Sequence, residues 1–228
     1  MGNSAASVEP AAGFDDLAVG IVGTGMMATA HATAWSSLGM KVYIGSRDAE
    51  RGQALARKIG NGCKGGTHAE MLEESNFILL CAHPGQDSWS FITDTLKPLA
   101  SGKGKMICDM SASYTRFCTD AQRAPEPHKS SLTYHKELLG DSTASWVKSW
   151  ANVMAQSISN FNRQPMEVAG DDAAKKMAFR MLTAAGFEPL DCGNAEDAKG
   201  IEPCSAPFNR PERVRHPRHL AHNGPNHP

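Results

Sequence analysis

The sequence predicts an α/β protein built on a doubly wound, mostly parallel sheet, with a short α/β extension at its C-terminal end. Short apolar runs that fit buried parallel strands alternate with stretches of helical periodicity between residues 17 and 119. A glycine-rich turn follows the first apolar run. The clearest helical stretch lies far downstream, between Gly170 and Gly186, and short strand-like segments flank it.

Strands are expected where apolar residues are continuous. Residues 77–82 form the most apolar run in the chain, and a run that is apolar at every position fits a central strand covered on both faces. The expected strands are 18–22, 41–44, 77–82, 105–110, 147–150, 166–169 and 187–190. The last of these contains a proline, which suits an edge strand.

Helices are expected between these strands, where apolar residues recur every three or four positions. The first expected helix follows the glycine-rich turn, and Ala30, Ala34 and Leu38 lie on one of its faces. The other expected helices cover residues 51–59, 89–96 and 171–185. Asp48 and Asp171 precede two of them and are expected to cap them. The apolar face of the last helix consists of Ala174, Met177, Ala178, Met181, Leu182 and Ala185.

The chain is expected to hold one domain between two irregular ends. Residues 1–16 are small and polar, which predicts a disordered leader, and the tail over 205–228 is rich in Pro, Arg, His and Asn. The domain over 17–204 divides into a core at 17–119, a loop at 120–143 and an extension at 144–204.

Composition excludes several classes of function. The formal net charge is -1 over 228 residues, so no basic field points to nucleic acid. No run approaches the ~20 apolar residues that span a bilayer, and no secretory signal precedes the domain. The six cysteines form no CxxC pair, which is typical of a reduced, cytoplasmic protein.

Two terminal features have competing interpretations. Gly2 follows Met1 as in N-myristoylated proteins, but Ala6 stands where that pattern has Ser or Thr, so a plain leader is favoured. His216, His219 and His222 recur every three residues in the tail, and without local structure to gather them they predict a solvated tail rather than a metal site.

The first chemical signal is the glycine-rich turn, which has the pattern G-x-G-x-x-A and consists of Gly23, Thr24, Gly25, Met26, Met27 and Ala28. It follows a buried strand and opens a helix, which is the context of a Rossmann-type dinucleotide site. In such a site the second glycine lets a pyrophosphate approach the backbone, and the amide groups at the helix start face the phosphates. The structural alternative is a tight turn that binds no ligand.

The second strand selects the dinucleotide. An NAD-binding protein has Asp or Glu about 20 residues after the glycines, where it binds the ribose 2′-hydroxyl. Here Ser46 and Arg47 hold that place, and Arg51 lies one helical turn further on. A guanidinium attracts a 2′-phosphate, so NADP(H) is favoured over two merely solvated arginines.

Ala82, His83 and Pro84 end the central strand at the edge where open α/β sheets place their ligands. His83 would contact either the nicotinamide or the hydride acceptor, or serve a local structural role, and the sequence does not choose between these roles. No Ser/His/Asp set or carboxylate pair is evident. Hydride transfer needs mainly positioning and exclusion of water, so such a set is not required.

The ordered set of motifs resembles the NADP reductases that use the deazaflavin coenzyme F420, and is similar to the cytosolic reductase domain of the six-transmembrane metalloreductases. The likeness covers about residues 17–204. It rests on the segments Gly20–Ala28, Ile44–Asp48, Val147–Trp150 (V-K-A-F in the family), Val168–Asp172 (V-A-G-D-D), Gly186–Gly193 (G-F-E-P-V-D-x-G) and Ala198–Glu202 (A-K-x-I-E in the metalloreductases).

This resemblance implies a dimeric NADPH-dependent oxidoreductase with a flavin, deazaflavin or ferric-chelate acceptor. It implies that Thr24, Met26 and Met27 meet the pyrophosphate. It further implies that Ser46, Arg47 and Arg51 bind the 2′-phosphate, and that Ala82, His83 and Pro84 line the nicotinamide.

The chain also departs from the family. The D-x-(S/T)-N-P segment is replaced by residues 109–113, which lack Asn-Pro, and Ala151 replaces the asparagine of V-K-A-F-N. The tail lacks the glycine-rich segment that helps form the deazaflavin site. A non-catalytic NADP(H)-binding sensor or partner protein is therefore the main alternative. An imine reductase of the pyrroline-carboxylate type shares the N-terminal half, but it needs a long helical dimerisation domain where this chain is rich in strands.

Overall fold

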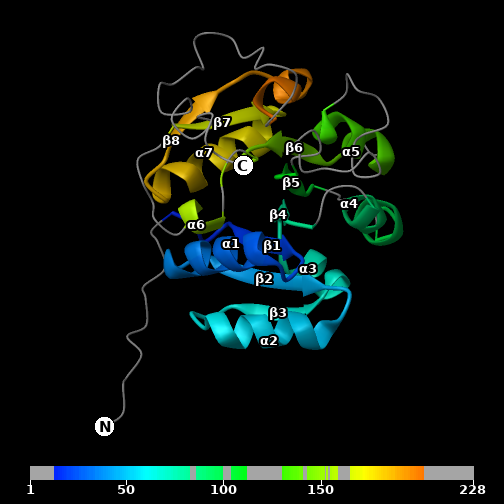
Figure 1. Cartoon of the computed structure of the whole chain (residues 1–228), viewed down its shortest axis with the longest axis vertical. Helices are drawn as coiled ribbons and strands as arrows, with labels where there is room; N and C mark the ends of the chain where they lie inside the picture. Colours follow the sequence, from blue (N-terminus) through cyan, green and yellow to red (C-terminus); the bar gives the residue numbers. More distant parts are fainter. Residues whose placement is uncertain are drawn as a thin grey trace, which may run out of the picture.

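The computed structural model describes residues 13–82, 86–99, 104–111, 130–140, 143–151, 153, 155–158 and 165–202. It confirms the predicted fold class. The strands form one eight-stranded sheet in the order β3-β2-β1-β4-β5-β6-β7-β8. Figure 1 shows this sheet extending from β3, at the bottom of the view, to β7 and β8 at the top.

The first half alternates strands and helices along the chain. Its elements are β1 (Ala18–Val22), α1 (Met26–Ser37), β2 (Lys41–Ser46), α2 (Ala49–Ile59), β3 (Lys64–Thr67), α3 (His68–Glu74), β4 (Phe77–Leu80), α4 (Gln86–Ser90), the π-helical η1 (Phe91–Leu96) and β5 (Met106–Asp109). All neighbouring strands among β1 to β6 pair in parallel. β1 lies between β2 and β4, so the crevice at the carboxyl end of β1 is the switch point where such sheets bind their ligands.

The second half continues the same sheet. Its elements are α5 (Ser131–Leu139), β6 (Ser145–Lys148), α6 (Ala155–Ile158), β7 (Pro165–Gly170), α7 (Asp172–Ala184), β8 (Glu188–Asp191) and the 3-10 helix η3 (Ala195–Ile201). β7 runs antiparallel to β6, and β8 runs parallel to β7 at the edge of the sheet. The proline in β8 is tolerated because an edge strand leaves one side of its backbone unpaired.

Side chains of successive strand residues enter two separate cores, one on each face of the sheet. Phe77 and Leu79 pack in the core that α1, α2 and α7 cover, whereas Ile78 and Leu80 pack in the core beneath α3, η1 and α5. All four side chains are at most 1% exposed. The uninterrupted apolar run of β4 therefore reflects burial on both faces, as predicted.

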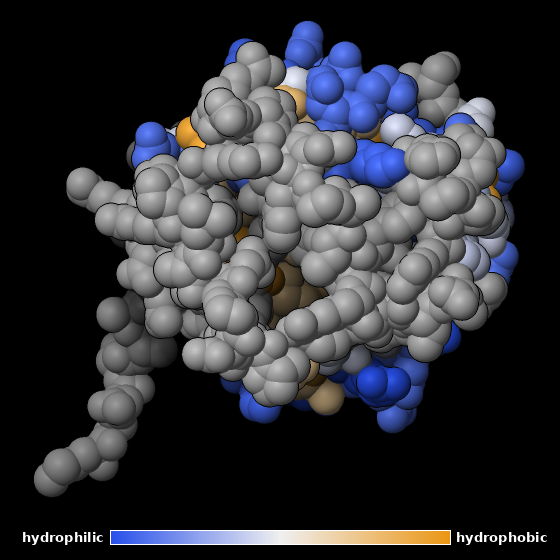
Figure 2. All heavy atoms as spheres, turned by 45° about the horizontal axis from the view of Figure 1, so that its top comes forward, coloured by the Kyte–Doolittle hydropathy of each residue, from blue (hydrophilic) through white to orange (hydrophobic). Residues whose placement is uncertain are grey.

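Polar side chains face outward around these cores. In Figure 2 blue, hydrophilic residues gather along the upper and lower edges of the face shown. No helix in the part of the chain that the structure describes is both long and apolar enough to cross a bilayer.

Two elements of the first half, β3 and α3, were not expected from the sequence. β3 has the sequence Lys-Gly-Gly-Thr, which carries no apolar run, and it is a strand because it pairs with β2 and packs under α2. A Cβ at Gly52 of α2 would lie 2.7 Å from the backbone oxygen of Gly66 in β3. The glycines of this segment therefore serve close packing of helix on strand, which hides the strand from an analysis of hydrophobic periodicity.

The expectation of a continuous loop over 120–143 is wrong for residues 131–139, which form α5. The helix begins at Ser130, whose side chain accepts a hydrogen bond from the Thr133 amide, and it ends at Gly140 in the left-handed conformation. Its buried residues include Ser131 and His135, and because these residues are polar, the buried face shows no continuous apolar periodicity in the sequence.

Of the two expected helix caps, the one at Asp48 is present and the one at Asp171 is not. Asp48 caps α2 by accepting a hydrogen bond from the Glu50 amide at 2.9 Å. Asp171 stands at the N-cap of α7 but makes no capping hydrogen bond. Its carboxylate instead binds Lys136 Nζ at 2.8 Å and the Trp146 amide at 2.9 Å, so it joins α5 and β6 to the start of α7. The apolar face predicted for α7 is buried as expected.

A histidine is buried inside the core on the α1 face. His31 is fully buried, and its Nδ1 accepts a hydrogen bond from Trp35 Nε1 at 3.2 Å. Its ring meets the Trp150 ring edge-on, with 5.5 Å between centroids. Burial lowers the pKa of His31 to about 3, so the imidazole is neutral in the folded protein.

This burial predicts a dependence of stability on pH. The folded-state pKa lies below the unfolded value of about 6.5, so the unfolded chain takes up the proton first. The contribution of His31 to stability is complete above pH 6.5 and declines as the pH falls towards 3; the loss at pH 5 is about 2 kcal/mol. Replacing His31 with Gln should remove this part of the decline between pH 7.5 and pH 5. Urea unfolding of both proteins at the two pH values measures the difference, and equal declines would show that His31 is accessible to protons in the folded state.

Candidate functional site

A cavity of about 720 Å³ opens at the carboxyl ends of β1, β2, β4 and β5. The glycine-rich turn forms its floor, and α4 and η1 form one wall. Its lining residues are Val22, Gly23, Thr24, Gly25, Met26, Met27, Ser46, Arg47, Asp48, Arg51, His68, Cys81, Ala82, Asp87, Ser90, Phe91, Asp94, Thr95, Met110, Ser111, Trp150, Ala151 and Val153. The structure thus brings together residues that are far apart in the sequence, including nearly all the described residues predicted for the site.

The glycine-rich turn presents the start of α1 to this cavity. Gly23 has a φ of +100°, a conformation that favours glycine, and its amide donates to Gly45 O at 2.8 Å. Gly25 is the N-cap and supplies no side chain, so no side chain caps the first amide groups of α1. Ala28 is fully buried against the sheet, as its small size predicted. The turn therefore offers backbone donors and the positive end of a helix dipole to an anion.

Gly25 is not required by the protein's own structure. Its φ is -78°, which any residue adopts, and a Cβ built at this position would meet nothing within 4 Å. By contrast, a Cβ at Gly20 would lie 2.3 Å from Met71 Sδ. Glycine at position 25 thus keeps open a space at the helix start. A pyrophosphate that approaches the amides would need this space, so the turn fits a dinucleotide.

The arginines predicted to select the coenzyme both line the cavity. Arg51 donates to Thr24 Oγ1 at 3.3 Å and so reaches the glycine-rich turn from α2. Arg47 forms an ion pair with Asp87 of α4, with Nη1 and Oδ1 3.3 Å apart. Ser46 is buried, and its hydroxyl accepts a hydrogen bond from the Asp48 amide, so it shapes the turn after β2.

His68 is a residue of this cavity that the sequence analysis missed. It opens α3 beside Gly45, and its ring packs edge-on against Phe91 with 5.1 Å between centroids. Burial and the charge of Arg47 lower its pKa to about 4, so it is neutral near pH 7. No motif marks His68, because it follows a strand that has no apolar pattern.

The opposite end of the cavity is apolar. Ala82, Met110, Trp150 and Val153 line it, together with Met26, whose side chain is 78% exposed. Trp150 has a φ of +54° although it is not glycine, and it is almost fully buried. Non-glycine residues in this conformation often lie at functional sites. His83 and Pro84, which were predicted to act here, lie outside the described residues.

A buried network of charges supports this apolar end. Lys148 of β6 is fully buried, with Nζ 3.1 Å from Asp109 Oδ2 and 3.0 Å from Glu202 Oε1. It also donates to the backbone oxygen of Ser111, which lines the cavity. Ser131 of α5 donates to Glu202 through its amide and to Asp109 through its hydroxyl, each at 2.7 Å. The network therefore joins β5, β6, α5 and the end of η3 behind one cavity wall.

The network retains its charges. Burial alone would raise the pKa of Asp109, but Lys148, His135 and Ser111 outweigh burial and hold that pKa well below its usual range. Burial alone would lower the pKa of Lys148, but Asp109 and Glu202 outweigh it and raise that pKa. Lys148 therefore stays a cation between two carboxylates. It was noted in the sequence only as part of the V-K-A-F-like segment.

The part of the chain that the structure describes holds neither a cluster of metal-binding residues nor a disulfide. No group of three His, Cys, Asp or Glu residues there could hold a metal ion. Cys63, Cys81, Cys108 and Cys192 are free. The tail histidines and the remaining two cysteines lie outside the described residues.

Comparison with known proteins finds a family match in the first half of the chain. Residues 18–113 match the model of a family described as NADP oxidoreductase, coenzyme F420-dependent. This segment holds the glycine-rich turn, both arginines and Asp87. No curated protein matches the sequence.

Solved structures share the whole fold at low sequence identity. A hypothetical protein from Sinorhizobium meliloti is 16% identical with a TM-score of 0.68, and the alignment covers 86% of this chain and 92% of that one. A candidate F420-dependent NADP-reductase from Arthrobacter sp. is 18% identical with a TM-score of 0.67, covering 82% and 89%.

A third solved structure is longer than this chain. A reductive aminase from Aspergillus terreus, in complex with NADPH and ethyl levulinate, is 16% identical with a TM-score of 0.56. The match covers 80% of this chain but only 56% of that protein. At these identities the three structures show the fold alone. Over residues 18–113 the chain thus matches the coenzyme F420-dependent family of NADP oxidoreductases, and its fold is similar to those of the three solved structures.

Proposed function

We propose that this protein is an NADPH-dependent reductase that passes hydride to a flavin or deazaflavin ring. Where a ferric chelate is the final acceptor, the two electrons of each hydride reduce two ferric ions by way of such a ring, and one proton is released. The observation that carries the proposal is the open space at Gly25, beside the uncapped start of α1. The family match of residues 18–113 supports NADP as the coenzyme. The nicotinamide of bound NADPH would supply the hydride.

The residues at each end of the cavity suit different parts of the coenzyme. The amides of Met26 and Met27 would bind the pyrophosphate, with Thr24 beside them. Arg47 and Arg51 would bind the 2′-phosphate, since a guanidinium pairs well with a phosphoryl group. Ala82 would lie at the nicotinamide end, where His83 and Pro84 follow it in the sequence.

The apolar end supports a planar acceptor. Met26 and Met110 offer apolar surface to a ring, because thioether groups pack well against such surfaces, and Trp150 lies at the same end of the cavity with its side chain almost fully buried. Hydride transfer between two stacked rings requires close positioning and the exclusion of water.

The cytoplasmic location and the homodimer remain predictions of the sequence.

The role of Gly25 can be tested with a substitution that separates binding from stability. Gly25→Asp should leave the melting temperature unchanged or slightly higher, because Asp is a favourable N-cap and Cβ meets open space. It should weaken NADPH by about 100-fold or more, because a carboxylate at the helix start replaces and repels the pyrophosphate. Fluorescence titration and thermal unfolding measure the two effects, with Gly25→Ser as the uncharged comparison. Unchanged NADPH affinity would show that the coenzyme does not bind at this turn.

The role of Arg47 predicts a loss that is selective for NADPH. Arg47→Ala should weaken NADPH by about 1–3 kcal/mol, the usual cost of losing a charged hydrogen bond, and should leave NADH almost unchanged. The control is Arg57→Ala, which removes a cation from the last turn of α2, the helix that follows Arg47. It should change neither affinity. Equal losses for both coenzymes in Arg47→Ala would contradict the assignment.

The acceptor is identified by assaying NADPH oxidation with a panel of free flavins, a deazaflavin and ferric chelates. We expect turnover with at least one ring acceptor, followed as loss of NADPH absorbance. The Gly25→Asp variant should abolish that turnover and serves as the blank. NADPH binding without turnover by any acceptor would instead favour the non-catalytic sensor.

A further inference from the structure

Arg47 already has an anionic partner inside the cavity. Its guanidinium lies 3.3 Å from the Asp87 carboxylate, and both residues line the cavity. The two come from different walls, since Arg47 follows β2 whereas Asp87 lies in the first turn of α4. The ion pair thus joins the two sides of the site at the end where the 2′-phosphate is expected.

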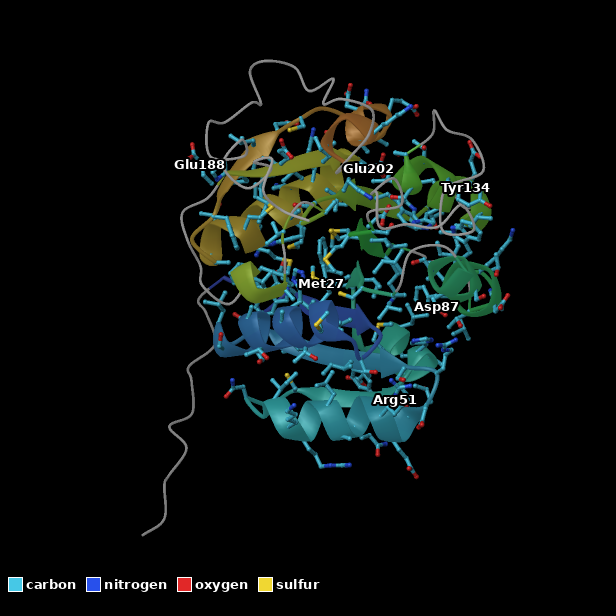
Figure 3. All side chains as sticks on the ribbon, in the orientation of Figure 1. Met27, Arg51, Asp87, Tyr134, Glu188 and Glu202 are labelled. Atoms are coloured by element: carbon cyan, nitrogen blue, oxygen red, sulfur yellow. The ribbon has the colours of Figure 1, made fainter. Side chains whose placement is uncertain are left out.

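The helix that carries Asp87 changes from α-helical to π-helical geometry along its length. After five residues α4 continues as the π-helical η1, which supplies Phe91, Asp94 and Thr95 to the same wall. π-helical turns are rare and often occur at functional sites. In Figure 3, Asp87 and Arg51 both lie on the right of the molecule, Asp87 on α4 and Arg51 on α2 below it.

We propose that Asp87 competes with the coenzyme's 2′-phosphate for Arg47 and thereby sets the affinity for NADP(H) relative to NAD(H). This role rests on the proposed function, because it assumes that NADP(H) binds in this cavity. Asp87 holds the guanidinium in the empty site and gives it up when the phosphate arrives. NAD(H) has a hydroxyl in place of that phosphate, so it leaves the ion pair intact.

The exposure of the pair makes this exchange feasible. The side chains of Arg47 and Asp87 are 78% and 47% exposed, and ion pairs of this kind contribute little to stability. A phosphate carries up to twice the charge of a carboxylate and accepts bidentate hydrogen bonds from a guanidinium, so it is the stronger partner. Asp87 therefore lowers NADPH affinity without preventing binding.

The other titratable groups near Arg47 make contacts of their own or carry no charge near pH 7. Asp48 caps α2, and Arg51 reaches Thr24. His68 is neutral near pH 7 beside Arg47. Asp94 lies seven residues after Asp87 on the α4–η1 wall and accepts a hydrogen bond from Thr93 Oγ1. Of the ion pairs found within the described ranges, only the one with Asp87 engages Arg47.

The first test is the substitution Asp87→Asn, which keeps the shape of the side chain and removes its charge. NADPH should bind about two- to fivefold more tightly, the range that an exposed ion pair allows, and NADH affinity should stay the same. Glu74→Gln is the matched control: Glu74 pairs with Lys64 at 3.5 Å with similar exposure but does not line the cavity. It should change neither affinity.

The second test separates competition for Arg47 from simple repulsion of the phosphate. In an Arg47→Ala background, Asp87→Asn should no longer tighten NADPH, because nothing remains to be exchanged. The same two- to fivefold gain in both backgrounds would overturn the proposal, since repulsion alone does not need the arginine. Titration of the four proteins with NADPH and NADH completes the cycle.

The outcomes also distinguish this role from the proposed function. If the wild-type protein bound NADPH and Asp87→Asn bound it no more tightly, only the role of Asp87 would fall. If the wild-type protein bound neither coenzyme, the proposed function would fall and this role with it.

Discussion

The charge of Lys148, buried between Asp109 and Glu202, constrains the arrangement of the whole molecule. A lone cation in this position would cost several kcal/mol in lost hydration, so both carboxylates must stay in place. Asp109 ends β5 in the first half of the chain, whereas Glu202 follows η3 at the end of the second half. The two halves of the chain are therefore joined by a network in which the loss of one partner would leave a buried charge unpaired. Because Lys148 also binds the backbone of Ser111, the same network fixes one wall of the cavity.

The cavity divides the chemistry between a polar and an apolar end. At the polar end, backbone amides and arginines face a region that Gly25 keeps open, and the Asp87 carboxylate pairs with Arg47. At the apolar end, Met110 follows β5 and Trp150 follows β6, the two strands that the buried network joins. Under the proposed function, binding of a coenzyme at one end and of a ring acceptor at the other would thus depend on residues from both halves.

Much of the first half could be predicted because its signals are local. The run of β4, the cap at Asp48 and the G-x-G-x-x-A turn each depend on neighbouring residues in the chain, and the structure confirms them. β3, α5 and His68 could not be predicted in this way. β3 is a strand because Gly65 and Gly66 let α2 pack against it, and α5 buries Ser131 and His135 against charges that lie far away in the sequence.

The sequence by itself determined the sheet class, the glycine-rich turn between β1 and α1 and the presence of arginine instead of a carboxylate after β2. These features are encoded over short distances, where steric rules and periodicity act. Only the tertiary structure decided which charges meet. Asp87 reaches Arg47, and Glu202 reaches Lys148, because the folded sheet brings residues 40 and 54 positions apart to within 3.3 Å of each other. Pairing over such separations follows from packing and desolvation, which no local pattern records.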